Sequence, residues 1–418
     1  MPIPLRVGVI GAGRMGRIRA LSAKAHPACQ VVHVSDIAND LAKALAAEVG
    51  CSSGVNWQAM LEHPDVDVVV VATPHKFLSP ITCAAIHAGK YVFCEKPMAR
   101  TAGEAKEVLN ALDIAAKFTP TPSSTKSSDK GVVVGYTLRH HPAVARAKDV
   151  VDSGEVGELL YIRGRYGHGG RSGYEKEWRG SRDLAGGGEL LDQGVHLIDL
   201  SRWFLGEFHQ VTGFLNSYFW NSANAPRPGN VLSSAVPSRS VSQSGEVEDN
   251  AFMMLRTLRG QTAMLHASWT QWKNMFSLEV FGSKGFVTVE GLGGNYGQER
   301  LMVGKRRPEG GVPSIEEIRF EQPAQAGTGV TRDSNRRGSA ALPIIASQSS
   351  CWDEEWADFV RIVQKRRESG ENAGNTLSAV ALDGLQNLRI VDALYSSAER
   401  NMPVELDLKP VAAVASLS

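Results

Sequence analysis

A strand, a glycine motif and a helix follow one another at the start of the chain and restrict its fold more than any other feature. Residues 6–10 form a short β-branched run, Gly11-Ala12-Gly13-Arg14-Met15-Gly16 comes next, and a helical stretch continues to about His26. A GxGxxG spacing alone is a weak signal, but this context makes it strong. The first glycine makes the turn, the second lets the backbone approach a pyrophosphate, and the third lets the helix pack on the strand. The stretch predicts a dinucleotide-binding βαβ unit; the alternative is a tight turn that binds no ligand.

An acidic residue ends the second expected strand and indicates which dinucleotide is bound. Asp36 closes the strand 31–36, about 20 residues beyond the glycine motif, where such folds place the carboxylate that binds ribose hydroxyls. This carboxylate would repel a 2′-phosphate, and the following Ile37 and Ala38 bring no arginine to receive one. The sequence therefore predicts NAD in preference to NADP.

Strands and helices alternate through the first third of the chain. Further strands are expected at 67–72, 91–94 and 132–136, and helices at 56–62, 81–88 and 101–118. This alternation predicts a doubly wound parallel sheet, a Rossmann domain, that ends near Thr137. The chain has 418 residues, which is long enough for a second domain.

Charged side chains follow two of these strands, at the edge where open α/β sheets bind ligands. Lys96 stands in the motif Glu95-Lys96-Pro97, directly after the strand 91–94. A cis bond within this motif would fix the direction of Lys96; the alternative for the lysine is a solvated loop charge. Arg139, His140 and His141 follow the last strand, and the proline after His141 favours a helix-entry role for that histidine over a ligand role.

The periodicity changes after Glu158, where most segments read as strands. Hairpin signals stand at 259–260 and 282–285. The pattern predicts an α+β domain with an open, mostly antiparallel sheet, so the chain is α/β overall, with domains at 1–137 and 138–408 and a tail at 409–418. Strands are expected at 159–166, 208–220, 250–258, 261–272, 276–281, 285–290 and 402–406, and helices at 352–365 and 377–398. A mobile loop is expected at 119–130, and long loops that cap a cleft or are disordered at 221–247 and 322–350.

One helix of the second domain concentrates ionisable groups. It follows the glycine run 186–188, and its Asp192, His196 and Asp199 are spaced by four and then three residues, which places them on one face. A carboxylate beside an imidazole is a proton-handling pair, and the apolar residues of the same helix would hold the pair rigidly against a sheet. The alternative is a helix-capping acid and a satisfied core imidazole.

The overall composition excludes several classes of partner. Lys and Arg number 45 against 44 Asp and Glu, a net charge of +1, with no dense basic face for nucleic acid or an anionic membrane. No apolar run reaches the length of a membrane span, so we expect neither an anchor nor an export leader. The five cysteines are scattered, and the sequence therefore predicts a cytoplasmic protein without disulfides or a metal site, whose partner is a small molecule.

Together these motifs resemble the glucose-fructose oxidoreductase, inositol dehydrogenase and MocA (Gfo/Idh/MocA) family over nearly the whole chain. The shared signals run in order from the glycine motif through Ala72-Thr73-Pro74 and Glu95-Lys96-Pro97 to the helix of Asp192, with later agreement at Glu248-Asp249, 281–285 and Pro403-Val404. The chain departs from the family pattern at His75, where asparagine is usual, and at Leu78, where histidine is common. The resemblance implies a Rossmann domain followed by a domain whose open sheet forms homodimers or homotetramers.

The resemblance also implies roles for individual residues. Lys96 would hydrogen-bond the reacting hydroxyl, His196 would act as general acid/base, and Asp192 would position the substrate. NAD contacts are expected at Gly11, Gly13, Arg14, Met15, Gly16, Asp36, Thr73, Pro74, His75, Glu95 and Lys96, with Glu95 at the nicotinamide ribose. The cationic and aromatic stretch 166–179 is suited to gripping a carboxylate, a phosphate or a sugar ring. Substrate contacts are expected at Arg139, Arg171, Tyr174, Trp178, Arg179, Asp192 and His196.

These residues predict the reversible, NAD(H)-dependent oxidation of a secondary hydroxyl on a sugar, cyclitol or nucleotide sugar. A histidine exchanges protons near neutral pH, and a lysine ammonium stabilises developing charge on oxygen. Two other functions use the same residues: a glycosidase that recycles bound NAD through oxidation and elimination, and a sugar and NAD sensor without turnover. Release of free NADH distinguishes a dehydrogenase from the glycosidase, and binding without reduction identifies the sensor.

Overall fold

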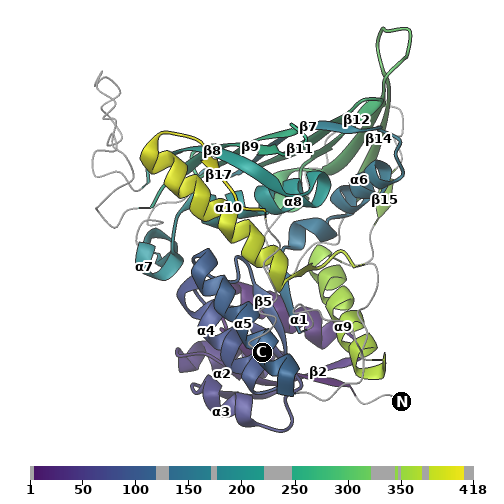
Figure 1. The fold of residues 1–418 in the computed structure, drawn as a ribbon. Coiled ribbons are helices and arrows are strands. Elements are labelled where there is room, and N and C mark those ends of the chain that lie inside the picture. The colour runs from purple at the N-terminus through teal and green to yellow at the C-terminus, as the bar shows by residue number, and fades with distance from the viewer. Residues whose placement is uncertain are drawn as a thin grey trace. The chain divides into compact units, whose positions relative to one another are not determined.

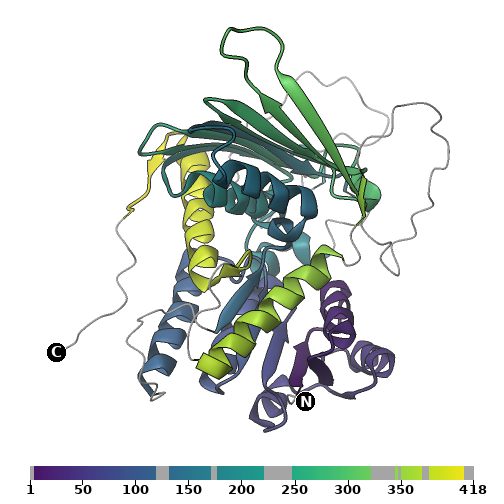
Figure 2. The same ribbon diagram turned by 90° about the vertical axis from the view of Figure 1, so that its right-hand side faces the viewer.

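The structure, a computed structural model, describes residues 4–118, 131–170, 177–220, 247–321, 344–346, 350–369 and 376–408. The chain forms two compact units, drawn in Figures 1 and 2. Unit 1 contains Met1–His140, Trp352–Arg389 and Lys409–Ser418, and unit 2 contains His141–Cys351 and Ile390–Leu408. The loops expected at 119–130, 221–246, 322–343 and 347–349, and the expected tail at 409–418, lie outside the described residues.

The centre of unit 1 is a seven-stranded sheet in the order β16-β6-β5-β4-β1-β2-β3. Strands β1 to β6 are parallel and have the 3-2-1-4-5-6 order of dinucleotide-binding folds, which confirms the predicted Rossmann sheet. The strands are β1 (Leu5–Ile10), β2 (Cys29–Ser35), β3 (Ser52–Gly54), β4 (Val68–Val71), β5 (Tyr91–Glu95), β6 (Val132–Gly135) and the antiparallel β16 (Ala379–Val380), and the helices are α1 (Arg14–Ala25), α2 (Asn39–Val49), α3 (Trp57–Glu62), α4 (His75–His87), α5 (Ala102–Phe118) and α9 (Cys351–Ser369).

Helix α9 belongs with the Rossmann sheet although it lies far along the chain. Its Trp356 and Phe359 are each 1% exposed. Their rings lie 5.8 and 5.4 Å from the ring of Phe93 in β5, centroid to centroid. The sequence placed all of 138–408 in the second domain, whereas the structure packs residues 352–389 with unit 1. The physical reason is this apolar face of α9, which is buried against the strands of unit 1.

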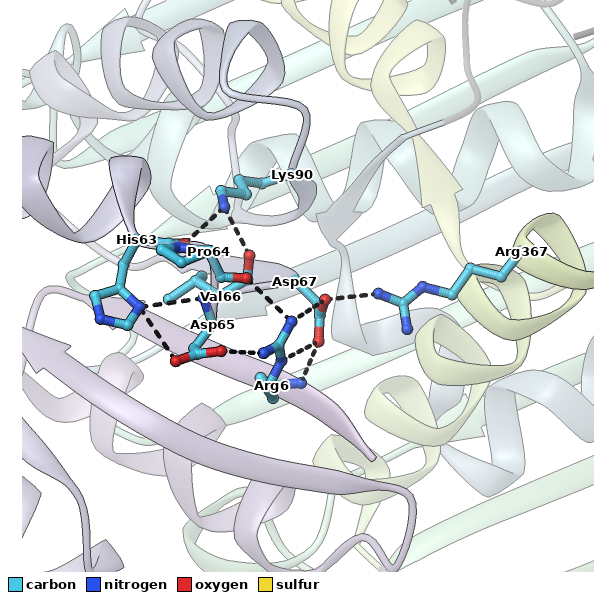
Figure 3. Close-up of polar contacts among 8 residues, drawn as sticks. All are labelled: Arg6, His63, Pro64, Asp65, Val66, Asp67, Lys90 and Arg367. Carbon is cyan, nitrogen blue, oxygen red and sulfur yellow. Dashed lines mark hydrogen bonds and ion pairs between the residues drawn. The ribbon is translucent and has the colours of Figure 1, made fainter. Parts of the chain in front are cut away.

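Charged side chains fasten the far end of α9 to the amino-terminal ends of two strands (Figure 3). Asp67 precedes β4 and accepts hydrogen bonds from the backbone N and the Nε of Arg6, at 2.9 and 3.0 Å. Arg367 of α9 places its Nη2 2.8 Å from Oδ1 of the same carboxylate. Burial alone would raise the pKa of Asp67, but the two arginines more than offset it and lower the pKa to about 2.

Unit 2 is built around a ten-stranded sheet in the order β15-β14-β13-β12-β11-β7-β10-β9-β8-β17. Its pairs are antiparallel except β7 with β10 and β14 with β15, so the predicted open, mostly antiparallel sheet is confirmed. The strands are β7 (Leu159–Gly167), β8 (Phe208–Asn216), β9 (Asn250–Thr257), β10 (Thr262–Ser268), β11 (Met275–Gly282), β12 (Gly285–Glu290), β13 (Glu299–Lys305), β14 (Ser314–Glu321), β15 (Ile344–Ala346) and β17 (Val404–Glu405), and the helices are α6 (Pro142–Asp152), α7 (Arg182–Ala185), α8 (Val195–Leu205) and α10 (Ala381–Arg400), which begins in unit 1.

The two faces of this sheet differ in what covers them. Helices α6 and α8 lie on one face (Figure 1), and Leu197 of α8 packs so closely on β7 that a Cβ at Gly164 would come within 3.2 Å of its Cδ2. The side chains that point to the other face include large apolar groups that are exposed: Tyr161, Phe214, Phe252, Met254 and Met264. Within the described ranges, none of the helices combines the length and the apolarity that a membrane crossing requires.

Candidate functional site

The three glycines of the Gly11–Gly16 motif occupy three different environments in unit 1. Gly11 has φ +96°, and a Cβ there would lie 2.4 Å from the carbonyl oxygen of Ala72. A Cβ at Gly16 would lie 1.7 Å from the carbonyl oxygen of Gly11. A Cβ at Gly13 would meet nothing within 4 Å. The fold therefore requires the first and third glycines, whereas the second leaves open space against the backbone, as the approach of a pyrophosphate needs.

Asp36 is held beside this glycine loop by two backbone groups. Its Oδ2 accepts a hydrogen bond from the Ala12 amide at 2.7 Å, and its Oδ1 accepts one from the Ala38 amide at 2.8 Å. Helix α1 begins at Arg14 without a side-chain cap, so the amides of Arg14 and Met15 at its positive end are available to an anion. An open loop, a helix N-terminus and a ribose-binding carboxylate fit the phosphates and the adenosine ribose of NAD.

The next predicted cofactor contacts lie at the start of α4. The sequence placed this helix at 81–88, but it begins at His75, with Pro74 in an extended N-cap conformation directly after Thr73. The prediction was wrong at this boundary because Pro80, which reads as a residue that opens a helix, lies inside the second turn. His75 is therefore the first residue of a helix and is 4% exposed.

Strand β5 delivers the motif Glu95-Lys96-Pro97 to the carboxyl edge of the same sheet. The peptide bond between Lys96 and Pro97 is cis. Lys96 is partly exposed, whereas Glu95 is buried. The lysine side chain is thus carried by a short segment that the buried glutamate anchors to the interior of unit 1.

Arg19 of α1 is the group that anchors Glu95, and sequence reasoning missed it. Its Nε donates to Glu95 Oε1 at 2.6 Å, and its Nη1 lies 2.7 Å from Glu355 Oε2 on α9. The guanidinium also stacks on Phe93, with its Cζ 4.3 Å from the ring centroid. Burial raises the pKa of Glu95 above its usual value, and the charge of Arg19 offsets part of this rise. The one sequence signal was an arginine at a position of α1 that faces the sheet.

In unit 2 close contacts explain the glycine run before the helix of Asp192 and His196. A Cβ at Gly187 would lie 1.9 Å from the hydroxyl of Tyr395, and a Cβ at Gly188 would lie 1.9 Å from the carbonyl oxygen of Glu248. The Oε1 of Glu248 accepts hydrogen bonds from the amides of Gly188 and Leu190, both at 3.0 Å, and from the Tyr395 hydroxyl at 2.8 Å. Glu248 thereby fixes the first turn of the helix.

The sequence predicted one regular helix for this segment, whereas the structure shows two kinds of helical turn. Residues Leu190–Gly194 form a π-helical turn, and α8 follows from Val195 to Leu205. Local periodicity does not reveal such a turn, because the widening depends on how the glycine run is held. Asp192 and His196 are each 9% exposed, and Asp199 is 1% exposed. Asp192 lies in the π turn, a kind of distortion that is frequent at functional sites.

A cation and an aromatic ring accompany this acid and imidazole. Arg179 places its Nε 3.3 Å from Asp192 Oδ2, and its Cζ lies 4.3 Å from the ring centroid of Trp178. The ring of Tyr166 in β7 meets the His196 ring edge-on, with centroids 6.0 Å apart and an interplanar angle of 70°. Unit 2 thus brings four of its predicted site residues together with Tyr166, the first residue of the stretch 166–179 in which the sequence predicted substrate contacts.

The remaining predicted substrate contacts are Arg139, Arg171 and Tyr174. Arg139 is 4% exposed and forms an ion pair with Asp383 at 3.5 Å inside unit 1, which gives its cation a structural partner. His141 is the N-cap residue of α6 and bonds to Glu299 at 3.1 Å, in agreement with the helix-entry interpretation. Arg171 and Tyr174 lie outside the described residues. Within the described part of the chain, no group of three or more His, Cys, Asp or Glu is arranged to hold a metal ion.

Comparison with known protein families gives two matches that follow each other along the chain. Residues 5–118 match a family described as an oxidoreductase family with an NAD-binding Rossmann fold. Residues 144–288 match the GFO/IDH/MocA C-terminal domain. The two matched stretches contain every predicted site residue that the structure describes except Arg139.

Individual relatives and solved structures agree with these matches. Levoglucosan dehydrogenase of Pseudarthrobacter phenanthrenivorans is 31% identical over 302 residues, which cover 68% of this chain and 73% of the relative. Inositol 2-dehydrogenase of Rhizobium meliloti is 25% identical over 289 residues, 68% of this chain and 76% of the relative. A structure of levoglucosan dehydrogenase with NADH and L-sorbose has a TM-score of 0.73 at 25% identity and covers 96% of this chain and 99% of its own.

Proposed function

Because the chain belongs to the GFO/IDH/MocA family and is an NAD-dependent oxidoreductase of CH–OH groups, we propose that it oxidises or reduces one secondary hydroxyl of a sugar, cyclitol or nucleotide sugar. The observation that carries the proposal is the pairing of buried Asp192 with Arg179, next to His196 on a rigidly held helix. Such a group of charges handles protons and grips hydroxyl groups. The names of the relatives, which are dehydrogenases of a sugar derivative and of a cyclitol, support this substrate class.

The first unit supplies the cofactor site in this proposal. Bound NAD supplies the hydride acceptor that alcohol oxidation needs. The open backbone at Gly13 and the first turn of α1 would hold the phosphates, and Asp36 would bind the ribose hydroxyls. We propose NAD in preference to NADP, because a carboxylate at position 36 repels a 2′-phosphate and no arginine follows it.

The chain's own ionisable groups carry the proton chemistry. The imidazole of His196 takes the proton of the reacting hydroxyl in oxidation and returns it in reduction. The ammonium of Lys96 stabilises negative charge that develops on a substrate oxygen. Arg179 forms an ion pair with Asp192, and this carboxylate accepts a hydrogen bond from a second substrate hydroxyl.

Two substitutions test these roles. Lys96→Met and His196→Ala should each lower hydride transfer by about a hundredfold or more, measured as NADH absorbance with levoglucosan and myo-inositol as first substrates. Lys90→Met, which changes a lysine at the opposite end of β5, is the matched control and should keep the parental rate. If both site variants keep the parental rate, the assigned roles are wrong. Turnover without release of NADH would indicate the NAD-recycling glycosidase, and binding without reduction would indicate a sensor.

The outer face of the sheet in unit 2 bears on the oligomeric state. Phe214 is 58% exposed, Met264 50% and Met254 44%, and these side chains lie on adjacent strands. We propose that a second copy of this chain covers them, since exposed contiguous apolar patches mark association surfaces. Light scattering after gel filtration should show a dimer or tetramer for the parent and a smaller species for Met254→Lys/Met264→Lys. The control Val312→Lys changes an isolated exposed residue and should leave the mass unchanged.

A further inference from the structure

A buried amide lies next to the proposed acid/base group and is only half satisfied. Gln193 belongs to the π turn, directly after Asp192, and is 8% exposed. Its Nε2 donates a hydrogen bond to the hydroxyl oxygen of Tyr296 at 3.2 Å. Its Oε1 is buried and has no hydrogen-bond partner among the described residues. A buried acceptor without a donor is costly and rare, so it calls for a ligand or another specific explanation.

The hydroxyl of Tyr296 offers a hydrogen-bond donor, which complements the free acceptor of Gln193. Its oxygen accepts a hydrogen bond from Nε2 of Gln193. This bond uses an acceptor site of the phenol, and the described residues supply no hydrogen-bond acceptor for its own O–H. Burial raises the pKa of Tyr296 to about 12, so the O–H keeps its proton throughout the neutral range.

The backbone that carries Tyr296 is specialised for this placement. Tyr296 ends the short helical turn Gly294–Tyr296 in the connection between β12 and β13. The connection has positive φ at Gly291, Gly293, Gly294 and Gly297. A Cβ at Gly291 would lie 2.4 Å from the carbonyl oxygen of Gln298, so this part of the connection can pack as it does only with glycine. The ring is thus delivered to the π turn by a fixed loop.

Both polar groups adjoin the residues to which the chemistry is assigned. The rings of Tyr166 and Tyr296 lie 5.5 Å apart, and Tyr166 also contacts the ring of His196. The negative charge of Asp192 acts on both tyrosine hydroxyls. A donor and an acceptor therefore remain open next to the proposed acid/base, which is the pair that one alcohol group of a polyol can satisfy at once.

We propose that Gln193 and Tyr296 form a hydroxyl-binding subsite, which fixes one non-reacting hydroxyl of the polyol substrate. The substrate O–H donates to Gln193 Oε1, and its oxygen accepts from the Tyr296 O–H. Tyr166 is a positioning residue, because its ring packs against the ring of Tyr296. If the oxygen and nitrogen of the Gln193 amide were exchanged, the NH2 group instead of the oxygen would lack a partner. Either orientation therefore leaves one buried polar atom for a ligand. This inference rests on the proposed function, because it assumes a polyol substrate.

A matched set of variants and substrates tests the subsite. Tyr296→Phe removes the hydroxyl that donates to the substrate and accepts from Gln193 Nε2, and Gln193→Leu removes the acceptor Oε1. The matched control is Tyr218→Phe, a tyrosine of unit 2 that is 47% exposed. The probes are levoglucosan and myo-inositol, each with its set of singly deoxygenated analogues. Steady-state kinetics supply KM and kcat, and NADH fluorescence supplies a fold and cofactor readout that does not depend on turnover.

The expected result is a loss that depends on one substrate hydroxyl. Tyr296→Phe should raise KM for the full polyol by about tenfold, with kcat and NADH binding close to the parental values, as expected when a uniform binding contact is lost. One deoxygenated analogue should show the same loss with the parent protein and no further loss with Tyr296→Phe. Tyr218→Phe should behave as the parent. A Gln193→Leu variant that still binds NADH should show the same dependence on one substrate hydroxyl. If Gln193→Leu does not bind NADH, the subsite is tested by Tyr296→Phe alone.

Two outcomes overturn the subsite, and they are distinguishable. If the parent oxidises a polyol but Tyr296→Phe keeps its KM, or loses affinity equally for the full polyol and every deoxygenated analogue, the subsite is wrong and the proposed function stands. If calorimetry and kinetics show that the parent neither binds nor oxidises any of the polyols, the proposed function fails and the subsite fails with it.

Discussion

Arg19 and Glu95 form a buried ion pair in which the arginine side chain is 0% and the glutamate side chain 8% exposed. The pair connects the helix after the glycine loop to the strand that presents Lys96. Glu355 from α9 binds the same guanidinium, so three segments that are distant in the sequence meet at one cation. We infer that Arg19 positions the segment 95–97 through its buried contact with Glu95 and contacts neither cofactor nor substrate.

Removal of this cation should destabilise unit 1 strongly. Arg19→Met leaves Glu95 and Glu355 buried without their countercharge, and the free energy of unfolding should fall by about 3–5 kcal/mol. Arg17→Met is the control on the same helix: its ion pair with Glu48 is exposed and screened by solvent, so its loss should change the free energy of unfolding much less. Urea unfolding curves of the two variants measure the difference. Equal losses would show that the buried pair does not stabilise the unit.

Substitutions at the second and third glycines of the motif, Gly13 and Gly16, should have different effects on NAD affinity and on thermal stability. Gly13→Ala adds a methyl group to open space and should leave the melting temperature within about 2 °C of the parent, while NAD binding weakens by at least about tenfold. Gly16→Ala forces a Cβ onto the Gly11 carbonyl and should lower the melting temperature itself. Differential scanning fluorimetry and NADH titration give the two readouts. Unchanged NAD affinity in Gly13→Ala would exclude the proposed approach of the pyrophosphate.

Asp36 should set the choice between the two nicotinamide dinucleotides. Asp36→Asn removes the negative charge but keeps an oxygen for one of the two backbone amides that bind the carboxylate. The KM for NAD should rise by about 10- to 100-fold, because charged hydrogen bonds to the ribose are lost, and the preference over NADP should shrink. Kinetics with both dinucleotides check this. A variant that keeps the parental NAD:NADP ratio would show that another residue makes the choice.

The Asp67 cluster should make stability depend on acid pH. The folded pKa of about 2 lies below the value near 3.9 expected in the unfolded chain, so the unfolded state binds more protons between these values. The stabilisation is therefore complete above about pH 5 and is lost as the pH falls through 2, with a total of about 1–2 kcal/mol after allowance for solvent screening. Asp67→Asn should flatten the unfolding free energy in this window, whereas Asp65→Asn, at a residue that is 61% exposed, should change it little. An Asp67→Asn curve parallel to the parent would contradict the assignment.

The sequence could predict those parts of the fold that depend on local patterns of residues. Residues 68–71 are four consecutive valines, and all four are buried, as expected for a strand covered on both faces. The fold has a steric reason for glycine at Gly11 and Gly16 and leaves open space at Gly13, which is why the motif is informative. Strands β13 and β14 were missed because their polar residues, such as the Ser314–Glu321 stretch with four exposed positions, conceal the alternation.

The candidate site was predictable only as far as single elements extend. The helix of Asp192 and His196 was recognised from spacing, but its π turn depends on Glu248, which comes from a segment some 60 residues later. The roles inferred for Arg19, Gln193 and Tyr296 depend on partners in other helices, strands and loops. Local sequence patterns do not predict such partners. Residues that act through a distant contact become visible only when the chain is folded.

The position of α9 in unit 1 has a consequence for biosynthesis. The Rossmann strands up to Gly135 leave the ribosome more than 200 residues before Trp356 and Phe359, which cover Phe93. At about 5–20 residues per second the uncovered surface waits for at least about 10 s, during which it is a natural target for chaperones. Pulse proteolysis of ribosome-stalled chains should find residues 5–135 protected only after α9 has emerged, and early protection would show that the nascent sheet closes without it.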